Sequence, residues 1–454
     1  MTAPDHLKIT GPEDILGFIP HSLGYWPANS LVAMTMQGKR LGATLRVDLP
    51  DASRCRGPGL AAFALTVRDY LEADDAADGT LLAFFTGRSV EAVAEDAAED
   101  AAGDATDSAE GELGADSAVD SALDPAVLAR LLRELERTLG RAGLPVRDAW
   151  LVGERYWRNA FCLDPSCCAP PGRPIEEIRN SRLNAELVFR GSSVGAAPGR
   201  STPAALQEQG EPAVLEAEEG WARDFSGRWR DRAQFGAVLD VWERVFDAGG
   251  HRSARATKAS QAGEAALPAG LAGYLRASLR VAAWRDAVLV MAAAGRDAAE
   301  AGAEEFGMFD GGPGNPAALP ELDALPAAES AGAPGEAGPA GATAAETPGY
   351  GDVLLGLAPP APDWGRLAEL DRVLRQLGNC GGGEARAAAL TARGWIEWCR
   401  GRGSFADALF TAAGAEQPGY RLAELLAELG RRGTLCGWAR RREAAWQKFD
   451  PDAA

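Results

Sequence analysis

The sequence predicts an α/β N-terminal domain, a mixed sheet with flanking helices, followed by mostly α-helical middle and C-terminal parts. An apolar run at 30–36 precedes a segment at 41–48 in which apolar and polar residues alternate, which is typical of a β-hairpin. Two further apolar runs, 80–86 and 146–152, are separated by helical patterns. From about residue 174 the apolar spacing becomes helical. Alternating helices and strands predict helices layered on a sheet.

Caps and prolines predict where the N-terminal helices begin and end. Thr10-Gly-Pro-Glu13 resembles a capping box that starts a helix, and Pro20 is expected to end or kink it. Asp124 before Pro125 is typical of another helix start. The expected order of elements is αββαβαβ, with right-handed crossovers where strands run parallel.

The remaining chain is expected to be helical, with one linker. Residues 307–350 contain 16 Gly or Pro among 44 residues, a low-complexity composition. The expected divisions are an α/β domain at 1–90 and 125–173, an acidic disordered insert at 91–124, a helical region at 174–306, a disordered linker at 307–350, and a helical, tetratricopeptide-like part at 351–454.

The negative charge is concentrated in two segments. The chain has 46 basic and 65 acidic residues, a net charge of −19. Segment 91–124 carries twelve acids and no base, and segment 297–350 carries ten acids and no base. Uninterrupted like charge with few aromatic residues cannot bury enough apolar area to fold. Both segments are expected to be solvated and disordered, and a docking tail for a basic partner is the alternative.

Composition also bears on location and partners. The longest apolar stretch, 281–294, is interrupted by Arg285 and Asp286, so no membrane span is expected. The start of the chain lacks the pattern of a secretory signal, and seven cysteines are an odd number that argues for a reducing compartment. Only four basic residues are Lys, and none cluster with aromatic residues, which disfavours nucleic acid. A cytoplasmic protein is expected.

A 34-residue pattern near the C-terminus resembles the tetratricopeptide repeat. The matching positions are Leu390, Gly394, Trp398, Gly401, Ala406, Phe410, Ala413 and Pro418. Gly394 and Ala406 are small, as two closely crossing helices require. Since three repeats are usually needed for a solenoid, this one hairpin is expected to pack on other helices. It either offers a groove to a protein partner or simply forms core.

Several stretches together resemble a known family. Gly11-Pro-Glu-Asp-Ile-Leu-Gly-Phe-Ile-Pro-His-Ser-Leu-Gly-Tyr-Trp-Pro-Ala-Asn-Ser-Leu-Val32, with 45–50, resembles the opening block of the actinobacterial family catalogued as domain of unknown function 4192. Residues 156–157 with 162–172 are similar to its middle block, and 395–426 to its closing helices. The family has no assigned activity, substrate or catalytic residue. The resemblance therefore implies a shared architecture and an actinobacterial cytoplasm.

Two motifs invite chemical interpretations. The first is a group of three cysteines, Cys162, Cys167 and Cys168, whose thiolates could bind zinc or take part in thiol chemistry. Two adjacent cysteines rarely both reach one metal ion. We therefore expect a structural loop without metal or cofactor. Gly191-Ser-Ser-Val-Gly195 matches a nucleophile elbow centred on Ser193. An elbow needs a strand before the serine and a helix after it, whereas a helical pattern precedes this one.

The best candidate ligand site is a loop beside the hairpin. Aromatic and polar residues next to strand ends in an α/β fold favour a pocket. The expected site comprises His21, Tyr25, Trp26, Asn29, Arg46 and Asp48. The alternative is structural, with Arg46 paired to Asp48 and His21 capping the helix broken at Pro20.

These observations favour a non-catalytic binding or scaffold protein, with a protein partner contacted through the C-terminal helices. The alternative is an enzyme acting on a small molecule at His21, Arg46 and Asp48.

Overall fold

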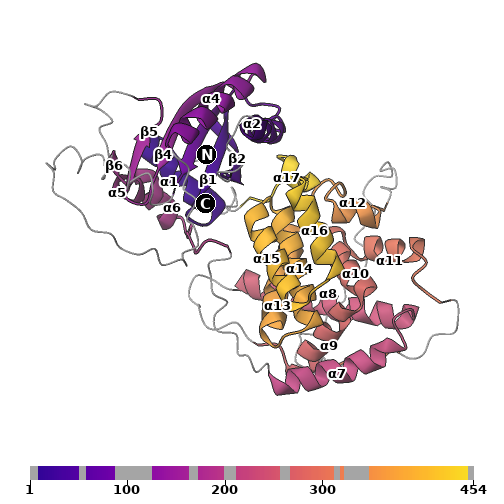
Figure 1. Ribbon diagram of the computed structural model, residues 1–454. Helices are drawn as coiled ribbons and strands as arrows, with labels where there is room; N and C mark the ends of the chain where they lie inside the picture. The colour runs from indigo at the N-terminus through magenta and orange to yellow at the C-terminus, as the bar shows by residue number, and fades with distance from the viewer. Residues whose placement is uncertain are drawn as a thin grey trace, which may run out of the picture. The chain divides into compact units, whose positions relative to one another are not determined.

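A computed structural model describes eight stretches of the chain. They are residues 9–50, 58–86, 125–162, 172–198, 211–255, 266–310, 317–321 and 347–447. The contacts divide the chain at residue 200 into unit 1, Met1–Arg200, and unit 2, Ser201–Ala454 (Figure 1). The predicted acidic insert and most of the predicted linker lie outside the described residues.

Unit 1 is an α/β fold with one mixed sheet. Its elements are α1 (Pro12–Leu23), β1 (Ser30–Gln37), β2 (Arg40–Asp48), α2 (Pro58–Leu71), β3 (Gly79–Phe85), α4 (Pro125–Arg141), β4 (Val146–Val152), β5 (Tyr156–Asn159), β6 (Arg173–Pro174), α5 (Glu176–Arg179) and α6 (Arg182–Phe189). The strand order is β2-β1-β3-β4-β5-β6. Among the strands that the structure describes, only β3 and β4 pair in parallel. The predicted fold class is confirmed, and the short strands β5 and β6 were not predicted.

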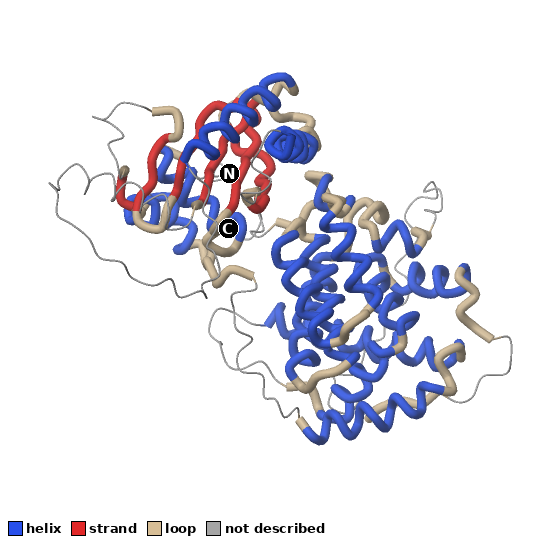
Figure 2. Tube along the Cα trace, viewed as in Figure 1, coloured by secondary structure: helices blue, strands red, loops and turns tan. Residues whose placement is uncertain are grey.

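Alternating side chains of the strands divide the core of unit 1 into two layers. Leu31 and Phe84 belong to a cluster with the leucines of α2 and α4, whereas Val32 and Phe85 belong to a cluster with α1 and Ile178 of α5. Successive strand residues face opposite sides of a sheet, so both faces are covered by helices (Figure 2).

Helix α1 is held against α6 by its polar face. The Asp14 carboxylate accepts hydrogen bonds from the Thr10 amide and hydroxyl, at 2.9 and 2.6 Å, and from the Leu183 amide at 3.1 Å. A Cβ atom on Gly17 would lie 2.9 Å from the Ser181 hydroxyl oxygen, so only glycine permits this close approach. The predicted capping box is therefore wrong in detail, because Thr10 pairs with Asp14 and the N-cap residue is Gly11.

The C-terminal end of α1 also differs from the prediction. The helix continues past Pro20 to Leu23, and ends at Gly24, whose φ of 87° is left-handed. The Gly24 amide donates to the Pro20 carbonyl at 2.8 Å. Glycine is favoured at this position because it adopts such a φ without steric cost. Because α5 and α6 pack on α1, the division between units falls at residue 200 instead of the predicted 173.

Unit 2 is helical over its described residues. Its elements are α7 (Pro212–Ser226), α8 (Arg232–Arg255), α9 (Ala269–Arg280), α10 (Ala282–Ala294), α11 (Arg296–Glu305), α12 (Tyr350–Leu354), α13 (Trp364–Asn379), α14 (Glu384–Cys399), α15 (Gly403–Glu416), α16 (Arg421–Arg431) and α17 (Gly437–Arg440). One apolar cluster runs through all of them, with Trp242, Trp284, Trp395 and Trp438 fully enclosed. None of the helices described in either unit is long and apolar enough to cross a membrane.

Parts of the predicted linker pack on these helices. The Ala318 amide and carbonyl bond to the Gln234 side chain at 2.8 and 2.9 Å. Tyr350 is the first residue of α12, and its ring lies close to Gly302. A Cβ atom on Gly302 would fall 1.8 Å from the Tyr350 ring. These contacts place residues from both ends of the Gly- and Pro-rich stretch within unit 2.

A buried arginine joins three parts of unit 2. Arg276 on α9 has no exposed surface and donates from Nε to Glu218 of α7 at 2.6 Å. Its other nitrogens donate to the carbonyls of Leu377, at the end of α13, and of Gly381 and Gly382 in the α13–α14 loop. The guanidinium thus binds one carbonyl in the last turn of α13 and two carbonyls of the following loop.

The Asp14 contacts predict a pH-dependent stability. Burial alone raises the pKa of Asp14, but the hydrogen bonds from Thr10 and Leu183 outweigh it and lower the pKa below its ordinary value. The stabilisation is therefore present above about pH 4 and lost as pH falls through the lowered pKa.

We expect Asp14→Asn to lower the free energy of unfolding of unit 1 by about 2 kcal/mol at pH 7, and by less in acid. Urea unfolding at a series of pH values measures this, and the exposed Asp75→Asn is the control. An equal loss at all pH values would contradict it.

The Arg276 network predicts a large effect of removing its carboxylate. Glu218→Ala leaves a buried guanidinium without its counter-ion, and we expect it to destabilise unit 2 by about 3 to 5 kcal/mol. The neighbouring Glu219→Ala removes only an exposed partner of Arg280 and should cost less than about 1 kcal/mol. Urea denaturation of the two variants compares them, and similar losses would show that the buried pair contributes little.

Candidate functional site

His21 lies in a buried polar network between α1 and α6. Its Nδ1 is 2.8 Å from the Ser192 hydroxyl, and its Nε2 is 2.7 Å from Oδ1 of Asn184. Asn184 donates from its amide nitrogen to the Arg179 carbonyl at 2.6 Å, which turns its oxygen toward His21. Because an amide oxygen only accepts, Nε2 carries a proton and donates to Asn184.

Tyr25 and Trp26 contact the same region. Tyr25 is buried and its backbone pairs with Gly195, whose amide donates to the Gly24 carbonyl at 2.9 Å. The Trp26 ring meets the Phe85 ring edge-on at 6.2 Å, and the Arg179 guanidinium lies 5.5 Å from it. The segment after α1 therefore packs on the sheet and on the turn that follows α6.

Asn29, Arg46 and Asp48 lie at the open end of the hairpin. The Asn29 carbonyl accepts from the Leu49 amide at 2.9 Å, and its φ of 46° is one that asparagine tolerates. Arg46 bonds to the Ser30 hydroxyl at 2.8 Å and pairs with Asp48 at 2.5 Å. Asp48 is 77% exposed, so this is a surface ion pair of small energetic weight.

The contacts thus join the expected site residues in two groups. Among hydrogen bonds between described residues, those of His21 go to Ser192 and Asn184, and those of Arg46 go to Ser30 and Asp48. The structural alternative for Arg46 and Asp48, that they pair with each other, is what the geometry shows.

The serine motif lies in the wrong setting for a nucleophile elbow. Helix α6 precedes it instead of a strand, and the described residues that follow, up to residue 198, contain no helix. The residue that meets His21 is Ser192, which precedes the central Ser193 of the motif, and Ser192 is 4% exposed. Its amide already donates to the Leu187 carbonyl at 2.9 Å, so it is not available as an oxyanion donor.

Of the three cysteines of the predicted loop, the structure describes only Cys162. Cys162 is half-buried, and its amide donates to the Asn159 side chain at 3.1 Å. Cys167 and Cys168 lie outside the described residues. Within the described stretches no group of three His, Cys, Asp or Glu side chains is placed to hold a metal ion.

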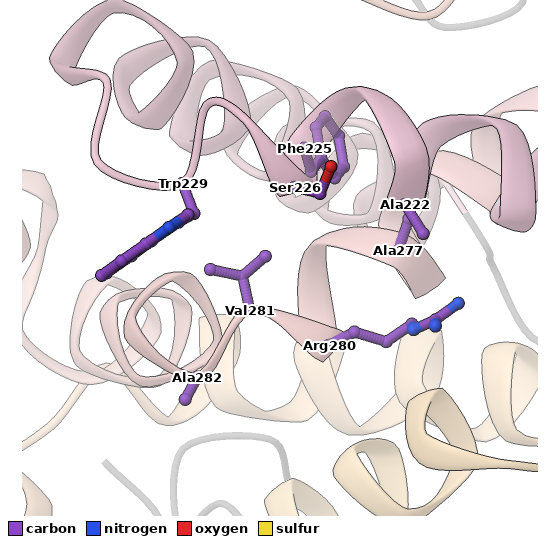
Figure 3. Close-up of a pocket in the computed structure, with 8 residues that line it drawn as sticks. All are labelled: Ala222, Phe225, Ser226, Trp229, Ala277, Arg280, Val281 and Ala282. Atoms are coloured by element: carbon purple, nitrogen blue, oxygen red, sulfur yellow. The ribbon is translucent and has the colours of Figure 1, made fainter.

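Unit 2 contains a cavity that the sequence did not reveal. It lies between the end of α7 and the junction of α9 with α10, and its volume is about 320 Å³ (Figure 3). We call it the Trp229 cavity. It is lined by Ala222, Phe225, Ser226, Trp229, Ala277, Arg280, Val281 and Ala282. This volume is at the lower end of the roughly 300 to 1,000 Å³ of ligand pockets.

Trp229 forms one end of this cavity. Its carbonyl accepts from the Trp284 indole at 3.2 Å, which fixes the backbone of the α7–α8 turn, whereas its ring is 45% exposed. Figure 3 shows Val281 in the middle and Arg280 toward the other end. The signal in the sequence is a tryptophan between two arginines, Arg228 and Arg230, in a turn between helices.

The positive charge of Arg280 is already neutralised. Arg280 pairs with Glu219 at 2.7 Å, Glu218 at 3.5 Å and Glu384 at 3.7 Å. The Ser226 hydroxyl donates to the Arg223 carbonyl of its own helix. The cavity therefore offers mainly apolar and aromatic surface to an occupant, with little charge to recruit an ion.

Comparison with known proteins supports the family resemblance alone. No curated protein and no solved structure matches the chain. A sequence model of the family described as "Domain of unknown function (DUF4192)" matches residues 12–304 and 362–434. These ranges include α1 with its contacts to α6, the Trp229 cavity and helices α13 to α16. The chain therefore belongs to the DUF4192 family.

Proposed function

We propose that this protein is a non-catalytic binding or scaffold protein, and that the Trp229 cavity receives a neutral apolar or aromatic group of its ligand. The observation that carries the proposal is the exposure of the Trp229 ring, which is nearly half exposed beside the apolar cavity. The backbone of Trp229 is fixed by the hydrogen bond from the Trp284 indole. Exposed tryptophan beside an apolar pocket is typical of binding hot spots, because it offers large contact area at small entropic cost.

The same surface supports a protein partner bound through the C-terminal helices. Arg280 at the cavity pairs with Glu384, the first residue of α14. In the α14–α15 hairpin, a Cβ atom on Gly394 would lie 2.4 Å from the Phe410 ring, as the tetratricopeptide-like pattern requires. On α16, Leu425 is 45% exposed. We propose a tetratricopeptide-like partner surface continuous with the cavity, in a protein of the actinobacterial cytoplasm.

A neutral fluorescent probe tests the cavity. We expect N-phenyl-1-naphthylamine to bind the full chain with a rise in emission. Trp229→Ala, which removes the aromatic wall, should weaken binding about 5- to 10-fold. Ala282→Trp, which fills the hollow, should weaken it as well. Fluorescence titration measures the affinities.

Phe306→Ala is the matched control, because Phe306 is 65% exposed in the same unit but does not line the cavity. Equal probe affinity in wild type and Trp229→Ala, with a loss in Phe306→Ala, would place the site elsewhere and refute the proposal.

An enzyme acting on a small molecule at His21, Arg46 and Asp48 is the alternative, and one observation favours its first residue. The Ser192 hydroxyl lies 2.8 Å from His21 Nδ1 and Asn184 binds its Nε2, an arrangement that resembles a nucleophile, a base and an orienting group. The burial of Ser192 and the engagement of its amide favour a structural role. Arg46 and Asp48 face each other on the surface of the hairpin.

A serine-directed probe separates these functions. We expect a fluorophosphonate to leave Ser192 unlabelled, since no substrate reaches a buried hydroxyl. We also expect Ser192→Ala to lower the free energy of unfolding of unit 1 by about 1 to 3 kcal/mol, because the buried hydrogen bond between Ser192 and His21 is lost. Mass spectrometry of labelled peptides and urea unfolding measure the two effects. Labelling that disappears in Ser192→Ala would favour the enzyme.

A further inference from the structure

One short piece of the Gly- and Pro-rich stretch lies against the helices of unit 2. Residues 317–321 are described, whereas 311–316 before them and 322–346 after them lie outside the described residues. Residues 317–321 form neither helix nor strand. Within them Pro320 is buried, although Leu319 is 52% exposed. We call these five residues the docked segment, and its hydrogen bonds go to side chains of α8 and α9.

Gln234, in the first turn of α8, binds the main chain of the docked segment. The Ala318 amide donates to Oε1 of Gln234 at 2.8 Å, and Nε2 of Gln234 donates to the Ala318 carbonyl at 2.9 Å. Because a main-chain amide only donates and a carbonyl only accepts, this pairing fixes both ends of the glutamine amide. The side chain thus binds both main-chain groups of one residue, as a neighbouring antiparallel strand does.

Tyr274 of α9 completes this contact. Its hydroxyl donates to the Ala318 carbonyl at 3.4 Å and lies 3.3 Å from Nε2 of Gln234. The Tyr274 ring meets the Phe225 ring edge-on at 5.2 Å and the Trp221 ring at 4.9 Å, which holds the hydroxyl in place. Gln234 and Tyr274 have no exposed surface. Since buried polar groups are costly without partners, the site favours an occupant that offers both an N–H and a C=O.

The hydrogen bonds of this site go to the main chain of the docked segment, not to its side chains. The bonded residue, Ala318, is small, and the side chain of Leu319 is half exposed. Pro320 restricts Leu319 to extended conformations, so the segment loses little conformational freedom when it binds. The required pattern is therefore a small residue, any residue and a proline. The same triplet, Ala-Leu-Pro, recurs in the sequence at 324–326.

We infer that Gln234 and Tyr274 form a binding site for an extended peptide of a partner protein with this pattern, and that residues 317–321 occupy the site in cis. Partner peptides that add to a sheet edge are likewise bound through their main chains. A tethered segment has an effective concentration of about millimolar, so a partner peptide must displace it. The docked segment is thus autoinhibitory. The inference does not depend on the Trp229 cavity, because neither Gln234 nor Tyr274 lines that cavity.

An opened variant of the full chain and a labelled peptide test the inference. Ala318→Pro removes the amide that donates to Gln234, and Ala324→Pro removes the corresponding amide of the repeated triplet. A fluorescein-labelled peptide with the sequence of residues 317–321 is titrated with the protein, and fluorescence anisotropy measures its affinity. We expect the double variant to bind the peptide about 10-fold more tightly than wild type, because the competing segment in cis is lost.

Changes in the peptide leave the protein untouched and therefore separate binding from folding. N-methylation at the Ala318 position removes the donated proton and should weaken binding about 10-fold. Alanine at the Leu319 position changes only a half-exposed side chain and should leave the affinity nearly unchanged. The wild-type chain should show the same order of peptides at its lower affinity.

Two results would overturn the binding site: no binding of the peptide to the double variant, or equal binding of the N-methylated and unmodified peptides. Equal affinity of wild type and the double variant would contradict the occupation in cis. Gln234→Leu, added to the double variant, removes both hydrogen bonds to the main chain of the peptide and should abolish binding. Circular dichroism checks that this variant is folded, and undiminished binding by the folded variant would also refute the inference.

Discussion

The ion pair between Arg276 and Glu218 is the constraint on which unit 2 depends most. It fixes α7 against α9, and the remaining donors of Arg276 hold the α13–α14 loop. The following turns of α7 and α9 carry Phe225 and Arg280, which line the Trp229 cavity. Since a buried guanidinium is tolerated only when its donors are satisfied, the two helices are held in one register. The cavity is a consequence of that register.

In unit 1, the polar contacts of helix α1 hold elements together in a comparable way. Asp14, Gly17 and His21 recur at helical spacing on one face of α1, and each contacts α6 or the residues on either side of it. The opposite face of α1 packs Leu16 and Ile19 on the sheet. Helix α1 of this chain thus has a polar side that joins α6 and an apolar side that joins the sheet.

Local patterns predicted the fold class and the order of the main elements, because periodicity and caps act within a few residues. The β1–β2 hairpin and the crossover through α4 illustrate this. Strand β6 is two residues long, which is too short to show an alternation of apolar and polar residues, so the sequence could not predict it. The partners of His21 lie more than 160 residues away, and the Trp229 cavity combines α7 with the α9–α10 junction. Such contacts arise from tertiary packing, which spacing along the chain does not encode.

The central claim is that the helical unit binds an apolar group against Trp229. The indole region of a ¹H–¹⁵N correlation spectrum of the full chain, recorded during titration with N-phenyl-1-naphthylamine, tests it most directly. A Trp229→Phe variant assigns the resonance. The account predicts that the Trp229 indole signal shifts with the probe while that of the enclosed Trp438 stays in place. A Trp229 signal that does not move while other indoles shift would contradict it.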